Sequence, residues 1–157
     1  MKQGKTVQES MVAIAHVMQP QDANPAGNIH GGVIMKLIDT TAGVVATRHA
    51  RRNVVTASID RLDFHTPAFI GDLLTFKASL NLVGRSSMEI GVRVDSENLF
   101  TGEASHIASA YLIFVALGED GKAVEVPHLI LQNNNEKRRH QQALERSQQR
   151  LAERRRR

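Results

Sequence analysis

The stretch that most limits how this chain can fold is residues 31–46, which predict a helix that is apolar nearly all round. Large apolar residues recur there at helical spacing, and small residues lie between them. The large residues are Val33, Ile34, Leu37, Ile38, Val44 and Val45, and the small ones are Gly31, Gly32, Ala42, Gly43 and Ala46. A helix of this kind is buried, because it has no polar face to turn toward water. The rest of the chain must therefore wrap around it.

The other apolar residues follow the two-residue period of β-strands. Apolar and polar side chains alternate in most of these runs, whereas residues 105–117 are apolar almost throughout, which predicts a central strand. The expected strands are residues 10–19, 53–64, 72–82, 88–95 and 105–117. Short turns join the last four strands. We therefore expect an α+β fold in which a curved antiparallel sheet wraps around one helix.

One helix cannot cover both faces of such a sheet, and the sheet also keeps an unpaired edge strand. We therefore expect two copies of the chain to pair into a dimer. Two sheets joined edge to edge would bring the start of each helix near the partner's helix, so that a site could be built from both chains.

Composition indicates one ordinary globular domain, since 41% of the 157 residues are hydrophobic and 23% are charged. The chain has no Cys, which excludes disulfides, thiolate catalysis and cysteine metal sites and fits a cytoplasmic protein. We expect no signal peptide, and no run approaches the ~20 apolar residues of a membrane span. We divide the chain into an N-terminal segment (residues 1–9), a domain (10–128) and a basic tail (129–157).

The positive charge of the chain lies in this tail. Residues 136–157 contain nine Lys or Arg and three Glu, a charge of +6, so the preceding residues hold eleven basic and thirteen acidic side chains, a charge of −2. The tail has little apolar support, which predicts either a marginal polar helix or disorder. We expect a solvated appendage, with binding to RNA, anionic lipid or an acidic partner as the alternative.

A polar turn at the start of the helix and a carboxylate inside it have the layout of a site. Asp39 lies among apolar neighbours, where a carboxylate either finds a polar partner or resists ionisation, and either state suits a general base. Asn28 lies where a helix cap could form, and Gly31 and Gly32 would let a ligand approach free backbone N–H groups at the positive end of the helix dipole. Such groups can polarise a carbonyl oxygen.

Each of these residues also has a simpler interpretation. Asp39 could be a hydrogen-bonded helix carboxylate, Asn28 a plain helix cap and His30 a loop histidine whose ring is satisfied. The two glycines could merely turn the chain. The site interpretation is favoured because all of these residues occur within one short segment.

Residues 22–32, 35–39 and 46–49 resemble the hotdog-fold acyl-CoA thioesterases, in particular the brain-type acyl-CoA hydrolases and their single-domain bacterial relatives. The resemblance extends from about residue 11 to residue 126. Weaker matches lie at residues 63–67, 71–72, 83–88 and 114–117. The resemblance implies a hotdog fold and hydrolysis of a fatty acyl-CoA to a free fatty acid and coenzyme A. It implies no metal and no cofactor, because coenzyme A is part of the substrate.

The resemblance also implies roles for individual residues. Asp39 would activate or orient the attacking water, while Asn28 and the N–H of Gly32 would hold the thioester carbonyl. Asn28 and Asp39 are expected to meet across a subunit boundary. His30 would either orient the loop or touch the substrate. The residues expected near the phosphates or the pantetheine arm of coenzyme A are Arg85, Ser86, Ser87, Thr56, Ser58 and Asp60.

Several alternatives stay open. Residues 85–87 could be only a hairpin turn, and residues 129–135 and the four terminal arginines have no clear counterpart in the family. The family suggests a hexamer built as a trimer of dimers, whereas the residues themselves indicate only a dimer. Another activity of this fold is a dehydratase or hydratase of acyl thioesters, which usually relies on a catalytic histidine. A more distant alternative is a non-catalytic acyl-CoA sensor whose basic tail contacts nucleic acid.

Overall fold

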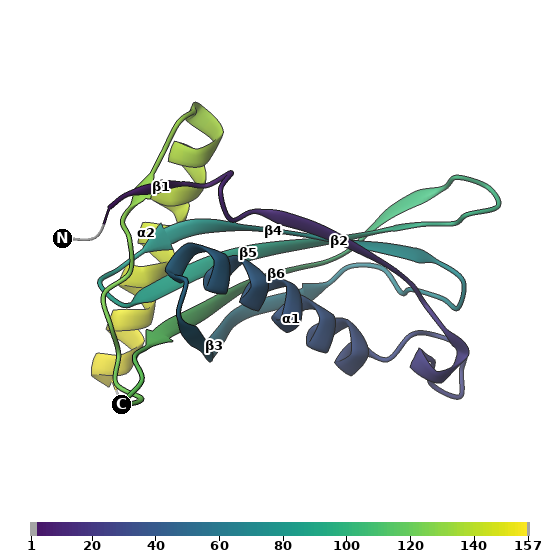
Figure 1. Ribbon diagram of the computed structural model, residues 1–157. Coiled ribbons are helices and arrows are strands. Elements are labelled where there is room, and N and C mark those ends of the chain that lie inside the picture. Colours follow the sequence, from purple (N-terminus) through teal and green to yellow (C-terminus); the bar gives the residue numbers. More distant parts are fainter. Residues whose placement is uncertain (1–2, 157) are drawn as a thin grey trace.

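The computed structural model describes residues 3–156. Met1 and Lys2 of the expected N-terminal segment, and Arg157 of the expected tail, lie outside the described residues. In chain order the elements are β1 (Lys5–Thr6), β2 (Val12–Val17), the short 3-10 helix η1 (Pro20–Asp22), α1 (Gly31–Ala50), β3 (Asn53–Phe64), β4 (Leu73–Val83), β5 (Ser87–Glu97), β6 (Ala104–Leu117), β7 (Leu129–Ile130) and α2 (Asn134–Arg156). Figure 1 shows α1 along one face of the sheet and α2 crossing the strands near one end.

The main sheet has five strands in the order β2-β4-β5-β6-β3, and all neighbouring strands are antiparallel. The expected α+β fold, with an antiparallel sheet on a long helix, is confirmed. The alternation of apolar and polar residues located most of these strands, because one face of the sheet is buried and side chains change face at every residue, and the apolar run located the other. The apolar run at residues 105–117 forms β6, which is an interior strand, while β5 occupies the centre.

Helix α1 fills the inner face of the sheet with its apolar side chains. Ile34, Ile38, Ala42, Val45 and Ala46 are all buried, and they meet buried residues of β4, β5 and β6 in one core, against which partly buried side chains of β3 also pack. The small residues allow close packing: a Cβ atom added at Gly43 would lie 3.6 Å from the ring of Phe114 on β6. The expectation that this helix is buried is therefore confirmed.

The basic tail forms a helix that docks on the outer face of the sheet. Along α2, His140 contacts the Asn81 carbonyl on β4, Arg146 contacts Glu89 on β5, and Arg150 contacts Asp60 on β3. Of the two alternatives drawn from the sequence, helix rather than disorder is observed. The expectation of a solvated appendage is wrong for these residues, because Arg146 and Arg150 form ion pairs with carboxylates of the sheet. The expectation fits the last turn, where residues 151–156 are exposed.

Coverage of the outer face changes the argument for a dimer. We expected one helix to leave this face bare, but α2 covers part of it, so the uncovered face alone does not require a partner. The unpaired edge does persist, because β3 has a neighbour only on the side of β6. The segments before and after the expected domain are also in contact, since β1 pairs with β7. The domain boundaries at residues 9 and 128 stay a prediction. Among residues 3–156, no helix has the length and apolar character needed to cross a membrane.

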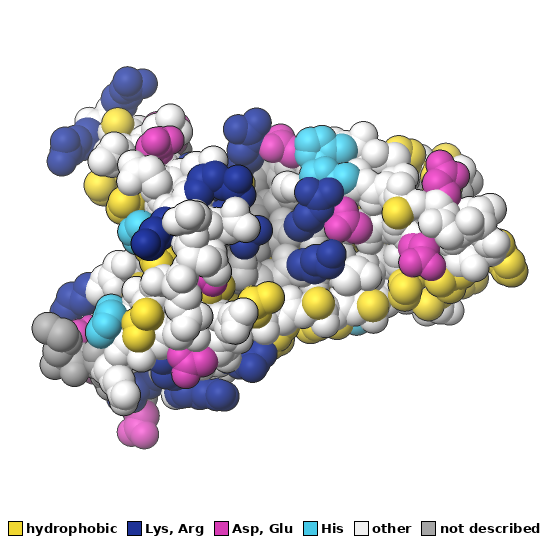
Figure 2. All heavy atoms as spheres, turned by 90° about the horizontal axis from the view of Figure 1, so that it is seen from above, with side chains coloured by type: hydrophobic (Ala, Val, Ile, Leu, Met, Phe, Trp, Pro, Cys, Tyr) yellow, Lys and Arg dark blue, Asp and Glu magenta, His cyan; other side chains and the backbone are white. Residues whose placement is uncertain are grey.

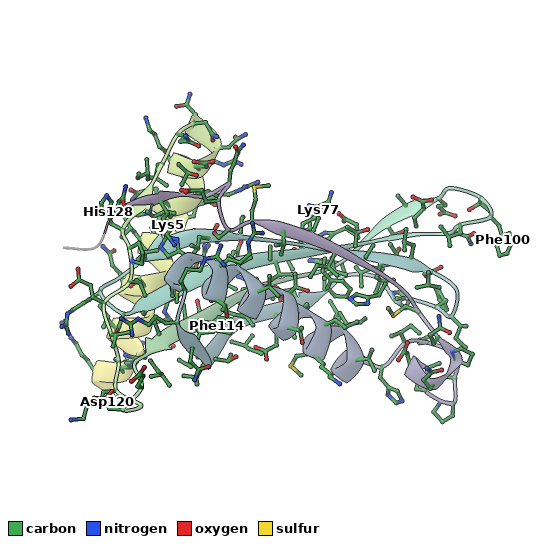
Figure 3. The ribbon with its side chains drawn as sticks, in the orientation of Figure 1. Lys5, Lys77, Phe100, Phe114, Asp120 and His128 are labelled. Carbon is green, nitrogen blue, oxygen red and sulfur yellow. The ribbon has the colours of Figure 1, made fainter. Side chains whose placement is uncertain are left out.

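The buried residue His49 lies in the last turn of α1. Lys5 and His128 lie near this end of the helix (Figure 3). The ring nitrogen Nε2 of His49 lies 2.7 Å from the carbonyl oxygen of Pro127, and Nδ1 has no hydrogen-bond partner in the described part of the chain. Burial lowers the pKa of His49 below its ordinary value of 6.5, and the nearby Lys5 adds to this effect. The fold therefore disfavours protonation of this ring, although the hydrogen bond with Pro127 opposes the shift of its pKa.

Acidification should weaken the fold through His49. Because the pKa of His49 is lower in the folded chain than in the unfolded chain, the unfolded chain binds the extra proton first, and stability is lost as the pH falls below about 6.5. We expect the melting temperature to fall between pH 7 and pH 5.5, and the His49→Gln variant to lose part of this dependence. Melting curves across this range would measure it. Equal slopes for the two proteins would contradict the assignment.

Candidate active site

Asp39 is held by a hydroxyl group from the strand that follows its helix. The hydroxyl Oγ1 of Thr56 on β3 donates to Oδ1 of Asp39 over 2.7 Å. The polar partner expected for this carboxylate is therefore Thr56. The hydrogen bond occupies one carboxylate oxygen and leaves Oδ2 free, so the arrangement fixes the direction in which Asp39 can accept a proton.

The Asp39 carboxylate lies at a hollow of about 480 Å³ between α1 and the sheet. Gly43 and Val44 line it from the helix, and Val54 and Phe114 line it from the strands. Figure 3 labels Phe114 between the sheet and the middle of α1. A hollow that is mainly apolar and carries one oriented carboxylate suits an apolar substrate that a water molecule attacks.

The start of α1 presents free backbone N–H groups. The N–H groups of Gly31 and Gly32 make no hydrogen bond within residues 3–156, as expected for the first turn of a helix. A Cβ atom added at Gly32 would meet nothing within 4 Å, whereas one added at Gly31 would lie 3.5 Å from the Phe64 ring, so the helix end is open at Gly32. These groups have the geometry needed to bind an oxygen that carries partial negative charge.

Asn28 and His30 precede this helix end. His30 stands at the N-cap position with an exposed side chain, and no side chain caps the helix. The interpretation of Asn28 as the helix cap is therefore wrong. The backbone of Asn28 instead forms an isolated bridge with Phe69, and its N–H donates to Oδ1 of Asn24. Asn28 is half-buried, so the loop holds its backbone and leaves its side chain partly accessible.

The two parts of the candidate site do not meet within one chain. Gly32 and Asp39 are separated by seven residues of α1, which at 1.5 Å per residue corresponds to roughly 10 Å along the helix. Groups that act on the same carbonyl must lie within about 3 Å of it. Within one chain, the N–H of Gly32 and the carboxylate of Asp39 are therefore too far apart to act on the same carbonyl.

Asn24 is a residue that the sequence reasoning passed over. Its side-chain Oδ1 accepts hydrogen bonds from the N–H groups of Ala26 and Asn28, at 3.0 and 3.2 Å. These contacts fix the carboxamide and leave its NH₂ group without a partner among the described residues. An oriented amide donor next to the start of α1 can also bind a carbonyl oxygen. The Asn-Pro pair at residues 24–25, which favours a turn, was the signal for an ordered loop.

Thr56 and Ser58 do not share a face of β3. Thr56 pairs with Phe114, and Ser58 pairs with Ile113, the next residue along β6. Directly paired residues point to the same face, and successive residues point to opposite faces, so Ser58 lies on the outer face, away from Asp39. Asp60 contacts Arg150 of α2 and is also on the outer side. Two β-bulges cause this change of face.

Arg85, Ser86 and Ser87 lie at the turn between β4 and β5, as their interpretation as a hairpin turn predicted. The carbonyl oxygen of Arg85 accepts from the N–H of Val126, and that of Ser86 accepts from Ala116. This turn is at the end of β4 farthest from the start of α1, and β4 has eleven residues. At about 3.3 Å per residue the turn is more than 30 Å from Asn28 within one chain.

A larger hollow of about 710 Å³ lies on the outer face of the sheet beneath α2. Five cationic side chains line it and no carboxylate does; they are Lys77, Arg93, Arg138, Arg139 and Arg146. Figure 2 shows Lys and Arg gathered in the middle of this face. Because it lacks a base for water activation, this hollow is not the candidate active site despite its size. Residues 3–156 also contain no cluster of three or more residues suited to a metal ion.

Comparison with known proteins defines the class. The thioesterase superfamily matches residues 26–99, which include the start of α1, Asp39 and Thr56. The cytosolic acyl coenzyme A thioester hydrolase of Rattus norvegicus is 38% identical over 85% of this chain, but the chain spans only 36% of the length of that relative. An uncharacterised acyl-CoA thioester hydrolase of Bacillus subtilis is 39% identical over 90% of this chain and 83% of its own length. The chain belongs to the thioesterase superfamily.

Solved structures agree with this assignment. A hexameric acyl-CoA thioesterase in its apo form has a TM-score of 0.93 with 38% identity, and the match covers 96% of this chain and 97% of that chain. An acyl-CoA hydrolase from Staphylococcus aureus, solved with butyryl coenzyme A, coenzyme A and coenzyme A disulfide, has a TM-score of 0.89 with 36% identity and covers 96% and 92%. The hotdog fold expected from the sequence is confirmed.

Proposed function

We propose that this chain is an enzyme that hydrolyses acyl-CoA thioesters to a free fatty acid and coenzyme A. The observation that carries the proposal is the Asp39 carboxylate, fixed by Thr56 at the edge of a mainly apolar hollow. The free oxygen of Asp39 takes a proton from water while the water oxygen bonds to the carbonyl carbon. The carbon–sulfur bond then breaks, and the proton passes to the leaving thiolate. The reaction uses only water and substrate, so the proposal includes no metal and no cofactor.

The carbonyl oxygen is held by the start of α1 from a second copy of the chain. Asn28 and the N–H of Gly32 supply the donors, and His30 orients the loop or touches the substrate. The separation of Gly32 from Asp39 within one chain supports this arrangement, and so does the unpaired edge of β3, along which two sheets can join. We propose a homodimer as the minimal active unit and a hexamer, a trimer of dimers, as its assembly; relatives described as hexameric support the latter.

The coenzyme A arm is proposed to extend from Asp39 toward Arg85, Ser86 and Ser87, with Thr56 beside its path. Ser58, expected there from the sequence, is left out of this role because it faces away from Asp39. Because the turn at residues 84–86 is distant from Asn28 in the same chain, this role also requires contributions from more than one subunit. A cation and two hydroxyl groups suit phosphate oxygens and amide groups. We also propose a cytoplasmic location, supported by relatives described as cytosolic. Binding of nucleic acid by the basic tail remains the weaker alternative, because α2 uses Arg146 and Arg150 within the fold.

Release of free thiol from acyl-CoAs of short to long chain length is the direct test. Turnover by the wild-type chain would support hydrolysis and rank the chain lengths. Binding of acyl-CoA without turnover would favour the sensor. Removal of water to form a carbon–carbon double bond, or addition of water to such a bond, with the thioester left intact, would favour a dehydratase or a hydratase.

Replacing each asparagine by aspartate should identify the carbonyl-binding amide. Aspartate keeps an acceptor oxygen and the approximate shape but removes the NH₂ donor. Loss of a donor to the carbonyl should lower kcat by about 10²-fold. We expect this loss for Asn28→Asp if Asn28 binds the carbonyl, and for Asn24→Asp if the oriented amide of Asn24 does so instead. Steady-state kinetics of both variants decide between them, and unchanged kcat in both would exclude either amide.

A further inference from the structure

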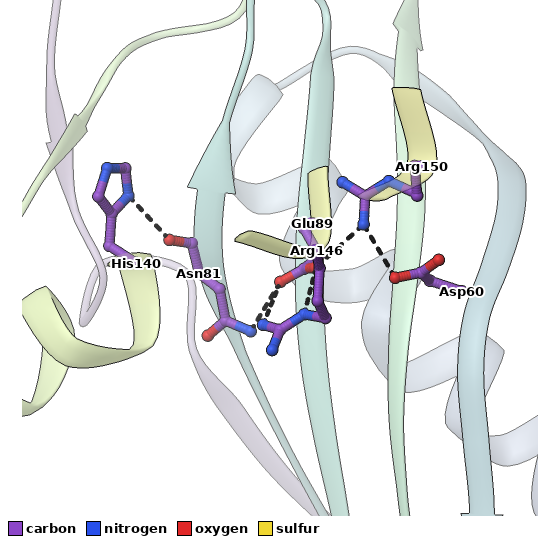
Figure 4. A network of polar contacts seen from close by, with 6 residues as sticks. All are labelled: Asp60, Asn81, Glu89, His140, Arg146 and Arg150. Carbon is purple, nitrogen blue, oxygen red and sulfur yellow. Dashed lines mark hydrogen bonds and ion pairs between the residues drawn. The ribbon is translucent and has the colours of Figure 1, made fainter. Parts of the chain in front are cut away.

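The C-terminal helix reaches the strand that carries Thr56 through a chain of ion pairs (Figure 4). The buried Glu89 carboxylate receives two hydrogen bonds from Arg146, each 2.9 Å long. Nη1 of Arg150 lies 3.4 Å from Oε1 of Glu89 and 3.0 Å from Oδ2 of Asp60. Arg150 therefore links β5, in the centre of the sheet, to Asp60 on the edge strand β3.

Strand β3 is irregular between Thr56 and Asp60. Six residues of β3, from Thr56 to Arg61, lie opposite only four residues of β6, from Tyr111 to Phe114, and Ala57 and Asp60 have no directly paired residue. Each bulge interrupts the ladder of hydrogen bonds and bends the strand. Because β3 is an edge strand, the chain itself supplies no neighbour on its other side, which is the side where the proposed dimer joins the two sheets. The contact of Arg150 with Asp60 restrains the bulged segment from the outer face.

We propose that Asp60, held by Arg150, is a positioning residue that keeps Thr56 in place against Asp39. The inference rests on the proposed function and extends it to the C-terminal helix. Asp60 belongs to the second bulge and Thr56 precedes the first, so a shift of the bulged segment moves the Thr56 hydroxyl relative to α1. Once that hydroxyl leaves Oδ1 of Asp39, the carboxylate can rotate, and its free oxygen no longer points at the attacking water.

The contact is shielded enough to restrain the strand. The side chains of Asp60 and Arg150 are only 20% and 19% exposed. A second ion pair on the same strand, Arg61 with Asp63, is 70% and 44% exposed. Exposed pairs in water have little effect on structure, whereas shielded pairs with fixed geometry have more. The exposed pair is thus a matched control for the shielded one.

Steady-state kinetics of the full-length chain should separate the two pairs. We expect Asp60→Asn to lower kcat for acyl-CoA hydrolysis about tenfold, with KM within about twofold of the wild type, because only the orientation of the base changes. Asp63→Asn should leave kcat unchanged. Arg150→Lys keeps the positive charge and should show a smaller loss than Asp60→Asn. If Asp60→Asn is poorly folded by circular dichroism, Arg150→Lys and Arg150→Gln provide the same comparison.

A double-mutant cycle distinguishes positioning from general damage to the fold. In a Thr56→Val background the hydroxyl is already absent, so Asp60→Asn should lower kcat no further. An equal loss in both backgrounds would overturn the role through Thr56. A wild type without turnover would overturn the proposed function and this role with it. An active wild type whose Asp60→Asn variant matches Asp63→Asn would overturn the positioning role alone.

Discussion

Asp39→Asn should lower kcat for acyl-CoA hydrolysis by roughly 10²- to 10⁴-fold, the usual contribution of a general base. The amide retains an oxygen that can accept from Thr56, so the side chain keeps its place. It has no negative charge and cannot take a proton from water. Affinity for coenzyme A should remain close to that of the wild type, because Asp39 acts on the water. Thiol release and titration calorimetry with coenzyme A measure the two quantities.

Thr56→Val is the informative comparison for this prediction. The variant keeps the shape and the carboxylate but removes the hydroxyl that orients it, so its kcat should fall far less than that of Asp39→Asn. A value of kcat within tenfold of the wild type in Asp39→Asn would exclude Asp39 as the base. Loss of both turnover and coenzyme A binding would indicate instead that Asp39 shapes the binding site.

The inner half of the fold and its carboxylate could be predicted from the sequence. A strand buried on one face shows a two-residue period in its sequence, and a helix buried all round shows an apolar run. Both signals were present here, and the limits of β3 agree residue for residue with the expected strand. Asp39 was identifiable because it interrupts such a run. Its partner Thr56 was named as a site residue but for another role, since nothing in the sequence brings a strand hydroxyl to a helix carboxylate.

The outer half could not be predicted, because its signals are the same as those of exposed residues. Glu89 alternates with Met88 and Ile90, as a water-facing residue of a strand does, yet it is buried under α2. Arg146 and Arg150 occur in a charge run of the kind that is usually solvated. The bulges of β3 also leave no mark in the sequence. The resemblance grouped Thr56, Ser58 and Asp60 near coenzyme A, whereas the bulges put Thr56 and Ser58 on opposite faces of the strand.

Burial of Glu89 makes its partner Arg146 important for stability. The Glu89 side chain is 1% exposed and that of Arg146 is 18% exposed. The guanidinium carbon of Arg146 also lies 3.6 Å from the centre of the Tyr111 ring. Burial alone would lower the pKa of Arg146, but its hydrogen bonds to Glu89 and the charge of Glu89 outweigh this and raise the pKa. The guanidinium of Arg146 is therefore held in its charged form, and the buried Glu89 carboxylate depends on its cations.

Arg146→Met should lower the free energy of unfolding by about 3 kcal/mol, because it leaves Glu89 charged and buried with only the more distant Arg150 nearby. Adding Glu89→Gln should recover most of this loss, since the amide removes the unpaired charge and can still accept from Asn81. Arg93→Met breaks an exposed ion pair with Asp95 and should change stability by less than about 1 kcal/mol. Urea denaturation of the four proteins measures these differences. Equal losses for Arg146→Met and Arg93→Met would show that α2 is not held by Glu89, and a double variant no more stable than Arg146→Met would show that lost packing rather than the buried charge sets the cost.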